Sequence, residues 1–163
     1  NAQTRLTMFE QLIDAAGHKG MVMGQAIDLA SVNQRVGLEH LQTMHRFKTG
    51  ALIKAAVLMG AQATEQATAE QLSDLGRYAD AIGLAFQVQD DILDVIADTE
   101  TLGKTQGADQ ALNKPTYVSL LGLESAQAKA KALHQEALAA LTGFDRRADA
   151  LRQLSAYIID RKH

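Results

Sequence analysis

Apolar residues recur every three or four positions along most of the chain, which is the spacing of one buried face of an α-helix. The most regular stripe begins after Thr68, a typical N-cap residue, and continues to about residue 98. Gly17 and Gly20 interrupt the pattern near its start, and Gly60 marks the end of another stripe. The pattern predicts helices over residues 5–16, 21–30, 38–60, 68–98, 116–142 and 146–161.

Residues 99–115 break the helical pattern. The segment contains two glycines, Asn113 and the only proline of the chain, so we expect a loop that leads into a helix at about Pro115. Aromatic residues make up only 4% of the chain, whereas Ala, Leu and Gln, which lose little rotamer freedom in a helix, are abundant. We therefore interpret residues 1–163 as one all-α domain without internal repeats.

The composition excludes several classes of function. A net charge of −3 gives no basic excess for binding nucleic acid. No uncharged apolar run approaches the roughly 20 residues of a membrane-spanning helix, so we expect no transmembrane segment. Cysteine is absent, which removes disulfides, thiolate zinc sites and cysteine nucleophiles, and we expect a reducing, cytoplasmic location.

The strongest chemical signal is an acidic face on the longest predicted helix. At about 100° per residue, three aspartates and a glutamine fall within an arc of roughly 100°. Like charges this close repel one another, so a solvated acidic stripe is the plain structural explanation and a divalent cation the functional one. Hard cations such as Mg²⁺, or Mn²⁺, take oxygen ligands from one or two carboxylates, waters and phosphate. The residues are Gln87, Asp90, Asp91 and Asp94.

Cationic residues occur at two places where they could meet this acidic face. Lys104 and Lys114 flank Asp109 in the expected loop, where solvated lysines are the alternative. Lys48 and Thr49 interrupt an apolar helix, and Lys48 could equally extend to solvent. A metal site beside ammonium groups is suited to a diphosphate.

Two further polar features support structural interpretations. Gln25 and Asp28 lie three residues apart, and a buried hydrogen-bonded pair is the simpler explanation for them. His40 and His45 lie five residues apart, which is not the four-residue spacing of a helical zinc pair. Neither feature therefore predicts a metal site by itself.

The sequence contains five blocks, residues 24–28, 45–52, 86–94, 113–117 and 157–161, that in this order resemble the trans-isoprenyl diphosphate synthases, in particular the bacterial farnesyl diphosphate synthases. The run from Phe86 to Asp94 looks like the second aspartate-rich motif of that family. Only one such motif occurs here, and Asn1 is not an initiator Met, so we expect the C-terminal half of a longer polyprenyl synthetase bundle, without the first motif. The motif is followed, at a family-like distance, by Gly103, Lys104 and residues 107–109.

The resemblance implies an all-helical isoprenoid synthase bundle that condenses isopentenyl diphosphate with an allylic diphosphate, geranyl or dimethylallyl, to farnesyl diphosphate. Mg²⁺ ions would help to draw the diphosphate off the allylic substrate and leave a carbocation. The implied roles are metal binding by Asp90, Asp91 and Asp94, diphosphate binding by Lys48, Lys104 and Lys114, catalysis by Lys48, Thr49 and Gln87, and support from Gln25, Asp28, Phe86 and Asp109.

Two other functions stay open from the sequence. A non-catalytic helical partner of a separate synthase subunit would not need the acidic face, and a terpene cyclase would not need isopentenyl diphosphate. With one acidic motif, we expect the 163-residue chain alone to be inactive. An unfinished bundle would expose apolar faces, and we expect a homodimer.

Overall fold

The computed structural model describes residues 1–100 and 115–161, with the side chains of 97–100 left aside, and the described residues form helices and connecting turns. The longest, α5, runs over Ala69–Glu100. The other helices are α1 (Ala2–Ala16), α2 (Met21–Ala30), α3 (Leu38–His45), the π-helix η1 (Arg46–Gly50), α4 (Ala51–Gln62), α7 (Tyr117–Leu121), α8 (Leu123–Ala140), the 3₁₀-helix η2 (Arg146–Ala148) and α9 (Asp149–Asp160).

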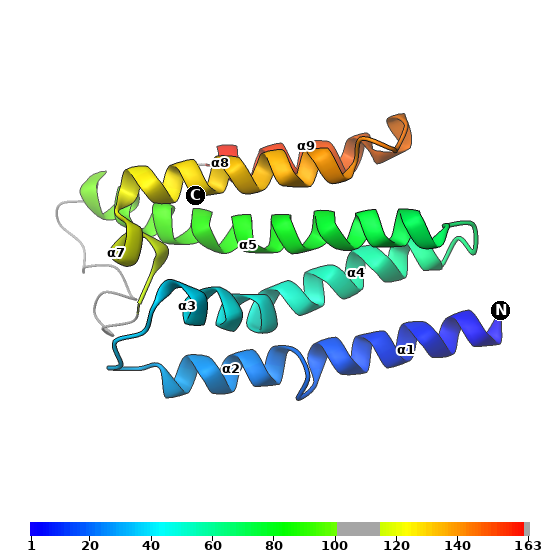
Figure 1. The fold of residues 1–163 in the computed structure, drawn as a ribbon, viewed down its shortest axis with the longest axis horizontal. Helices are drawn as coiled ribbons and strands as arrows, with labels where there is room; N and C mark the ends of the chain where they lie inside the picture. The colour runs from blue at the N-terminus through cyan, green and yellow to red at the C-terminus, as the bar shows by residue number, and fades with distance from the viewer. Residues whose placement is uncertain (101–114, 162–163) are drawn as a thin grey trace.

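The helices lie side by side in four rows (Figure 1). Helices α1 and α2 form one edge, the continuous run α3–η1–α4 packs against them, α5 follows, and α8 packs along α5 together with α9. The short helix α7 contacts α3, α5 and α8 at one end of the bundle. Helix α5 therefore forms the central support of the fold, and the all-α prediction is confirmed.

The helix predicted over 38–60 contains a π-helical turn that the sequence pattern did not reveal. Residues 46–50 are π-helical, between α3 and α4. A π-turn adds a residue to the helical turn and shifts the side chains that follow around the axis, often at functional sites. The apolar stripe continues on both sides, so its spacing alone predicted one uninterrupted helix.

The helix predicted over 116–142 is wrong in one respect, because it is two helices. Gly122 separates α7 from α8 with a φ of +81°, in the region that side chains rarely adopt. Thr116 caps α7, and its Oγ1 accepts a hydrogen bond from the Ser119 backbone N–H at 3.1 Å. The capping threonine and the glycine six residues later were the signals for a short separate helix.

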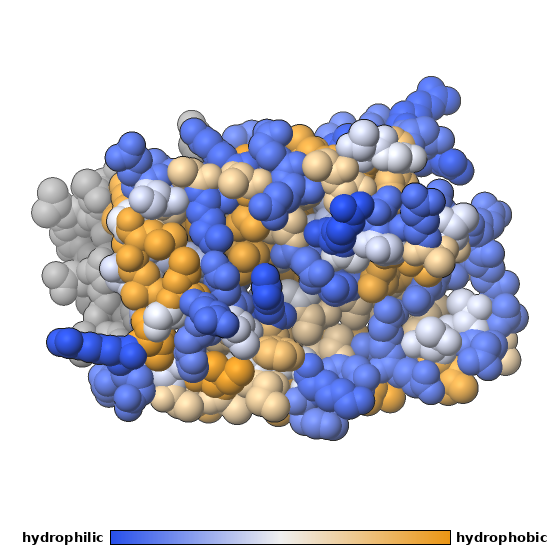
Figure 2. Space-filling model, viewed as in Figure 1, coloured by the Kyte–Doolittle hydropathy of each residue, from blue (hydrophilic) through white to orange (hydrophobic). Residues whose placement is uncertain are grey.

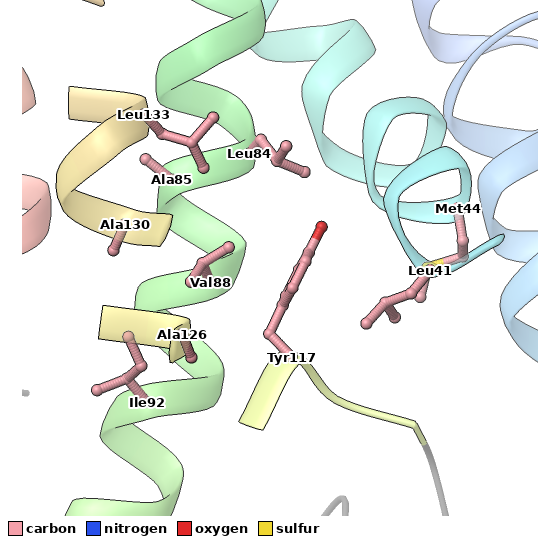
Figure 3. Packing of buried hydrophobic residues seen from close by; sticks show 10 residues of the cluster. All are labelled: Leu41, Met44, Leu84, Ala85, Val88, Ile92, Tyr117, Ala126, Ala130 and Leu133. Atoms are coloured by element: carbon pink, nitrogen blue, oxygen red, sulfur yellow. The ribbon is translucent and has the colours of Figure 1, made fainter. Parts of the chain in front are cut away.

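Two hydrophobic clusters fill the bundle, and both are built on α5. One lies around Tyr78 and Leu141, at the end where α8 and α9 meet. The other surrounds Tyr117, whose ring lies between α5 and α3 (Figure 3). Residues Leu41 and Met44 face it from α3, and Val88 faces it from α5. This second cluster lies beside the acidic face and fixes the relative positions of the helices that carry it.

The edge formed by α1 and α2 exposes large apolar side chains. Phe9 is 63% exposed, Ile13 66% and Leu29 66%. Figure 2 shows apolar surface on this side of the molecule, interrupted by polar residues. Large apolar side chains gathered on one exposed edge make this edge a candidate interface.

None of the described helices is long and apolar enough to cross a lipid bilayer.

Candidate active site

A cavity of about 260 Å³ lies between α2, the α3–η1 run and α5. Carboxylates line one side of it, from α5, and Lys48 and two histidines line the other. Pro115, at the start of the segment that leads to α7, also reaches it. The lining residues are Asp28, Ser31, Val36, His40, Leu41, Met44, His45, Lys48, Gln87, Asp90, Asp91, Asp94 and Pro115.

The Lys48 ammonium group is held on the wall of the cavity by Asp28. Its Nζ donates a hydrogen bond to Asp28 Oδ2 at 2.7 Å, and the Asp28 side chain is 7% exposed. Helices α2 and η1 approach so closely that a Cβ on Gly24 would lie 2.1 Å from the backbone N of Lys48. A glycine is therefore required at position 24 for the ion pair to form across this contact.

Asp90 lies at the centre of the acidic wall and is half-exposed. Its Oδ2 accepts a hydrogen bond from Gln87 Nε2 at 3.3 Å, and its Oδ1 accepts one from Arg161 Nη2. The Arg161 guanidinium lies 4.3 Å from the centre of the Phe86 ring and also donates to the Phe86 carbonyl at 3.3 Å. The end of α9 thus supplies a cation to the acidic face.

Asp91 differs from Asp90 and Asp94 because it is buried. Its Oδ2 accepts a hydrogen bond from the Tyr117 backbone N–H at 2.6 Å, and 6% of the residue is exposed. Burial raises the pKa of the Tyr117 phenol far above its usual range, and the nearby Asp91 carboxylate raises it further. Both groups face the interior rather than bulk solvent, whereas Asp94 is exposed.

The histidines of the opposite wall are held by specific contacts. The Ser31 hydroxyl donates to the Ile27 carbonyl at 2.6 Å, and Ser31 Oγ lies 2.8 Å from His40 Nε2. Since a hydroxyl has one proton to donate, Ser31 accepts a hydrogen bond from His40 Nε2–H. The His45 ring stacks on Tyr117 with centroids 5.6 Å apart and an interplanar angle of 21°.

The structure brings Lys48, Gln87, Asp90, Asp91 and Asp94 to one cavity, as the sequence predicted for a common site. Asp28 also lines it and binds Lys48, so Lys48 does not extend into open solvent.

Three predicted residues are not among those that line the cavity. Thr49 lies in η1, Phe86 lies beneath Arg161, and Gln25 is exposed on α2. The predictions for Lys104, Asp109 and Lys114 fall outside the described residues.

Sequence reasoning missed three contributors to the site. Arg161 belongs to the block 157–161 that resembles the family, but the sequence pattern assigned it no role in the site. Helical periodicity does not indicate an ion pair between residues 71 positions apart. The spacing of His40 and His45 argues only against a zinc pair, and no motif includes Ser31. The available signal for His40 was its position eight residues before Lys48, which places the two on the same side of a regular helix, about 80° apart.

No group of three or more carboxylate or histidine residues in the described part of the chain forms a ready-made metal centre. The arrangement instead offers Asp90 and Asp94 as separate oxygen donors beside a lysine. Mg²⁺ commonly binds one or two carboxylates and completes its shell with waters and substrate phosphates. This donor set fits a cation that arrives with a diphosphate.

Comparison with known proteins identifies relatives of the whole chain. Residues 3–155 match the family model described as polyprenyl synthetase. The farnesyl diphosphate synthase of Escherichia coli strain K12 is 49% identical over 160 residues, which cover 96% of this chain and 54% of that protein. The chain thus spans about half the length of the curated relatives it matches.

Solved structures agree with this relationship. An FPP/GFPP synthase from Zymomonas mobilis is 38% identical with a TM-score of 0.82, and the match covers 97% of this chain and 52% of that one. A geranyltransferase from Helicobacter pylori, solved with magnesium and isoprenyl diphosphate, is 34% identical with a TM-score of 0.79, covering 98% and 52%. The sequence and the fold both place this chain in the polyprenyl synthetase family.

Proposed function

We propose that this chain supplies the metal- and diphosphate-binding half of a prenyltransferase active site. The reaction is the condensation of isopentenyl diphosphate with an allylic diphosphate, in which geranyl diphosphate gives farnesyl diphosphate in one condensation and dimethylallyl diphosphate gives it in two. The observation that carries the proposal is the cavity in which Lys48 lies opposite Asp90 and Asp94. The names of the relatives support this choice of substrates.

Mg²⁺ is the cation proposed for the acidic wall, with Mn²⁺ as an alternative. Asp90 and Asp94 would hold it, because both line the cavity and neither is buried. When bound, it supplies positive charge to the leaving diphosphate. The magnesium in the related geranyltransferase supports the assignment.

The side chains of this chain prepare the substrate for loss of diphosphate. Lys48 binds diphosphate oxygens, with Lys104 and Lys114 proposed for the same role. The allylic C–O bond breaks and its electron pair leaves with the diphosphate, so positive charge develops on the prenyl carbons. Oxygen dipoles of Thr49 and Gln87 stabilise that charge.

The carbon–carbon bond forms when the isopentenyl double bond attacks the allylic carbon. The attack leaves a carbocation on the isopentenyl unit, and this cation loses a proton to the released diphosphate, which forms the new double bond and balances the reaction. Gln25, Asp28, Phe86 and Asp109 act behind the reacting groups. Of these, Asp28 has the clearest support, because its carboxylate holds the Lys48 ammonium group.

We further propose that the 163-residue chain alone has negligible turnover and that it forms a homodimer. One aspartate-rich motif occurs in its sequence, which leaves half of the expected metal ligands to other residues. The exposed apolar side chains of α1 and α2 support association with another protein surface.

A chimera tests the activity. Residues 1–163 replace the matching part of the Escherichia coli farnesyl diphosphate synthase, and product formation from geranyl and isopentenyl diphosphates is measured with Mg²⁺. We expect turnover, and an Asp90→Ala chimera should lose about 10²- to 10³-fold of it. A folded chimera with no turnover, or an Asp90→Ala chimera with full turnover, would contradict the proposal.

A further inference from the structure

The three aspartates of the acidic wall have different surroundings. Asp90 is half-exposed and Asp94 is exposed, whereas Asp91 is 6% exposed. Asp91 Oδ2 is hydrogen-bonded to a backbone N–H from another helix at 2.6 Å. A shared helix face therefore does not give these carboxylates a shared role.

The hydrogen bond from Tyr117 to Asp91 satisfies a donor that α7 cannot satisfy itself. Tyr117 is the first residue of α7, and the first amides of a helix have no carbonyl partner within that helix. Thr116 Oγ1 accepts from the Ser119 N–H, two residues further along. Asp91 and Thr116 thus each accept a hydrogen bond from an amide at the start of α7, and of these two acceptors Asp91 lies on α5.

Tyr117 connects this point to the opposite wall of the cavity. Its side chain is fully buried in the cluster between α5 and α3 (Figure 3). Its ring stacks on His45, which itself lines the cavity three residues before Lys48. A continuous series of contacts runs from Asp91 through Tyr117 to the helix that carries Lys48.

We propose that Asp91 is a positioning residue: through Tyr117 it fixes the spacing between the carboxylate wall and the Lys48 wall, while Asp90 and Asp94 bind the metal. The division of labour among the aspartates rests on the proposed function. The link from Asp91 to His45 rests on contacts within this chain alone.

Amide hydrogen exchange, followed residue by residue by NMR on the full chain, tests the positioning role. Asp91→Ala removes the acceptor, Asp91→Asn keeps an acceptor oxygen without the charge, and Asp94→Ala is the matched control. We expect the Tyr117 amide to exchange about tenfold faster in Asp91→Ala, with shifted His45 ring signals. Asp91→Asn and Asp94→Ala should keep the parent exchange rate and ring signals.

Binding of Mn²⁺ together with inorganic diphosphate, measured by titration calorimetry, tests the division of labour. We expect Asp91→Asn to bind within about twofold of the parent, and Asp90→Asn and Asp94→Asn to bind about tenfold more weakly. An Asp91→Asn variant as weak as Asp90→Asn would overturn the division. Unchanged Tyr117 exchange in Asp91→Ala would overturn the positioning role.

The two experiments test different claims, so one claim can be wrong while the other holds. If the parent chain binds no Mn²⁺, the proposed metal site is wrong, and the exchange data still decide whether Asp91 positions Tyr117. If Asp91→Ala does not fold, a folded Asp91→Asn with a protected Tyr117 amide supports the role of the acceptor oxygen. An Asp91→Asn variant with an unprotected Tyr117 amide would refute it.

Discussion

Arg161 donates a hydrogen bond to Asp90, although 71 positions separate the two residues in the chain. The Arg161 side chain is 14% exposed, and its guanidinium also packs over the Phe86 ring. The contact joins the end of α9 to the acidic face of α5. In the absence of a bound cation, it offsets part of the negative charge that three neighbouring aspartates impose on one helix.

This contact predicts a stability effect. Arg161→Ala should lower the free energy of unfolding by about 2 kcal/mol, because it removes a partly buried charge-assisted hydrogen bond and a cation–π contact. Urea unfolding followed by circular dichroism measures the change. Arg147→Ala is the control, because Arg147 pairs with Asp145 at an exposed site, and its midpoint should not move. Equal midpoints for parent and Arg161→Ala would show that the contact contributes nothing.

The two buried tyrosines should respond differently to loss of the hydroxyl group. The Tyr78 hydroxyl donates to the Leu151 carbonyl at 2.8 Å, so Tyr78→Phe should cost about 1 kcal/mol. The buried Tyr117 hydroxyl has no hydrogen-bond partner among the described residues, so Tyr117→Phe should leave stability unchanged or raise it. Denaturant unfolding of both variants checks the contrast. A larger loss for Tyr117→Phe would contradict the geometry.

The same tyrosines predict a loss of stability in alkali. Burial raises the pKa of Tyr78 to about 12 and that of Tyr117 further, whereas in the unfolded chain each phenol titrates near 10. The protonated phenols therefore make their full contribution to the free energy of unfolding below about pH 10. Above that pH the unfolded state ionises first, and each tyrosine removes about 1.4 kcal/mol per pH unit until its folded pKa is reached.

Urea unfolding at intervals between pH 9 and about pH 11.5 measures this loss. Tyr78→Phe removes one of the two groups and should make the decline shallower. The same slope in the parent and in Tyr78→Phe would mean that the Tyr78 phenol ionises normally in the folded chain.

The Ser31 hydroxyl fixes the tautomer of His40. Because Ser31 donates to the Ile27 carbonyl, the neutral His40 ring should carry its proton on Nε2. Long-range ¹H–¹⁵N correlation spectra distinguish the two tautomers. Ser31→Ala should release the preference, and a neutral parent ring protonated on Nδ1 would show that the Ser31 contact has the opposite direction.

The helical spacing predicted the architecture well because apolar stripes record which face each helix buries. The stripe of α5 predicted residues 68–98, and the helix spans Ala69–Glu100. The spacing of apolar residues did not reveal the π-turn at 46–50 or the break at Gly122, since both leave that spacing nearly intact. Single-residue backbone conformations have little effect on periodicity.

The candidate site was predictable as far as it lies on one helix. Gln87, Asp90 and Asp94 share a face that their spacing alone defines. The partners of that face come from distant segments: Arg161 from the end of α9 and Tyr117 from α7. Their approach depends on how the helices pack, which local spacing does not encode.

The most direct test of the account is binding of inorganic diphosphate in the presence of Mg²⁺, measured by titration calorimetry on the parent chain and three variants. Lys48→Gln keeps a donor for Asp28 but removes the positive charge, Asp90→Ala removes a proposed metal ligand, and Lys54→Gln alters a lysine that pairs with Asp80 outside the cavity. We expect Mg²⁺-dependent binding by the parent and by Lys54→Gln, and binding about tenfold weaker or absent in the other two. Equal affinity in all four proteins, or no binding by the parent, would contradict a diphosphate site between Lys48 and the acidic face of α5.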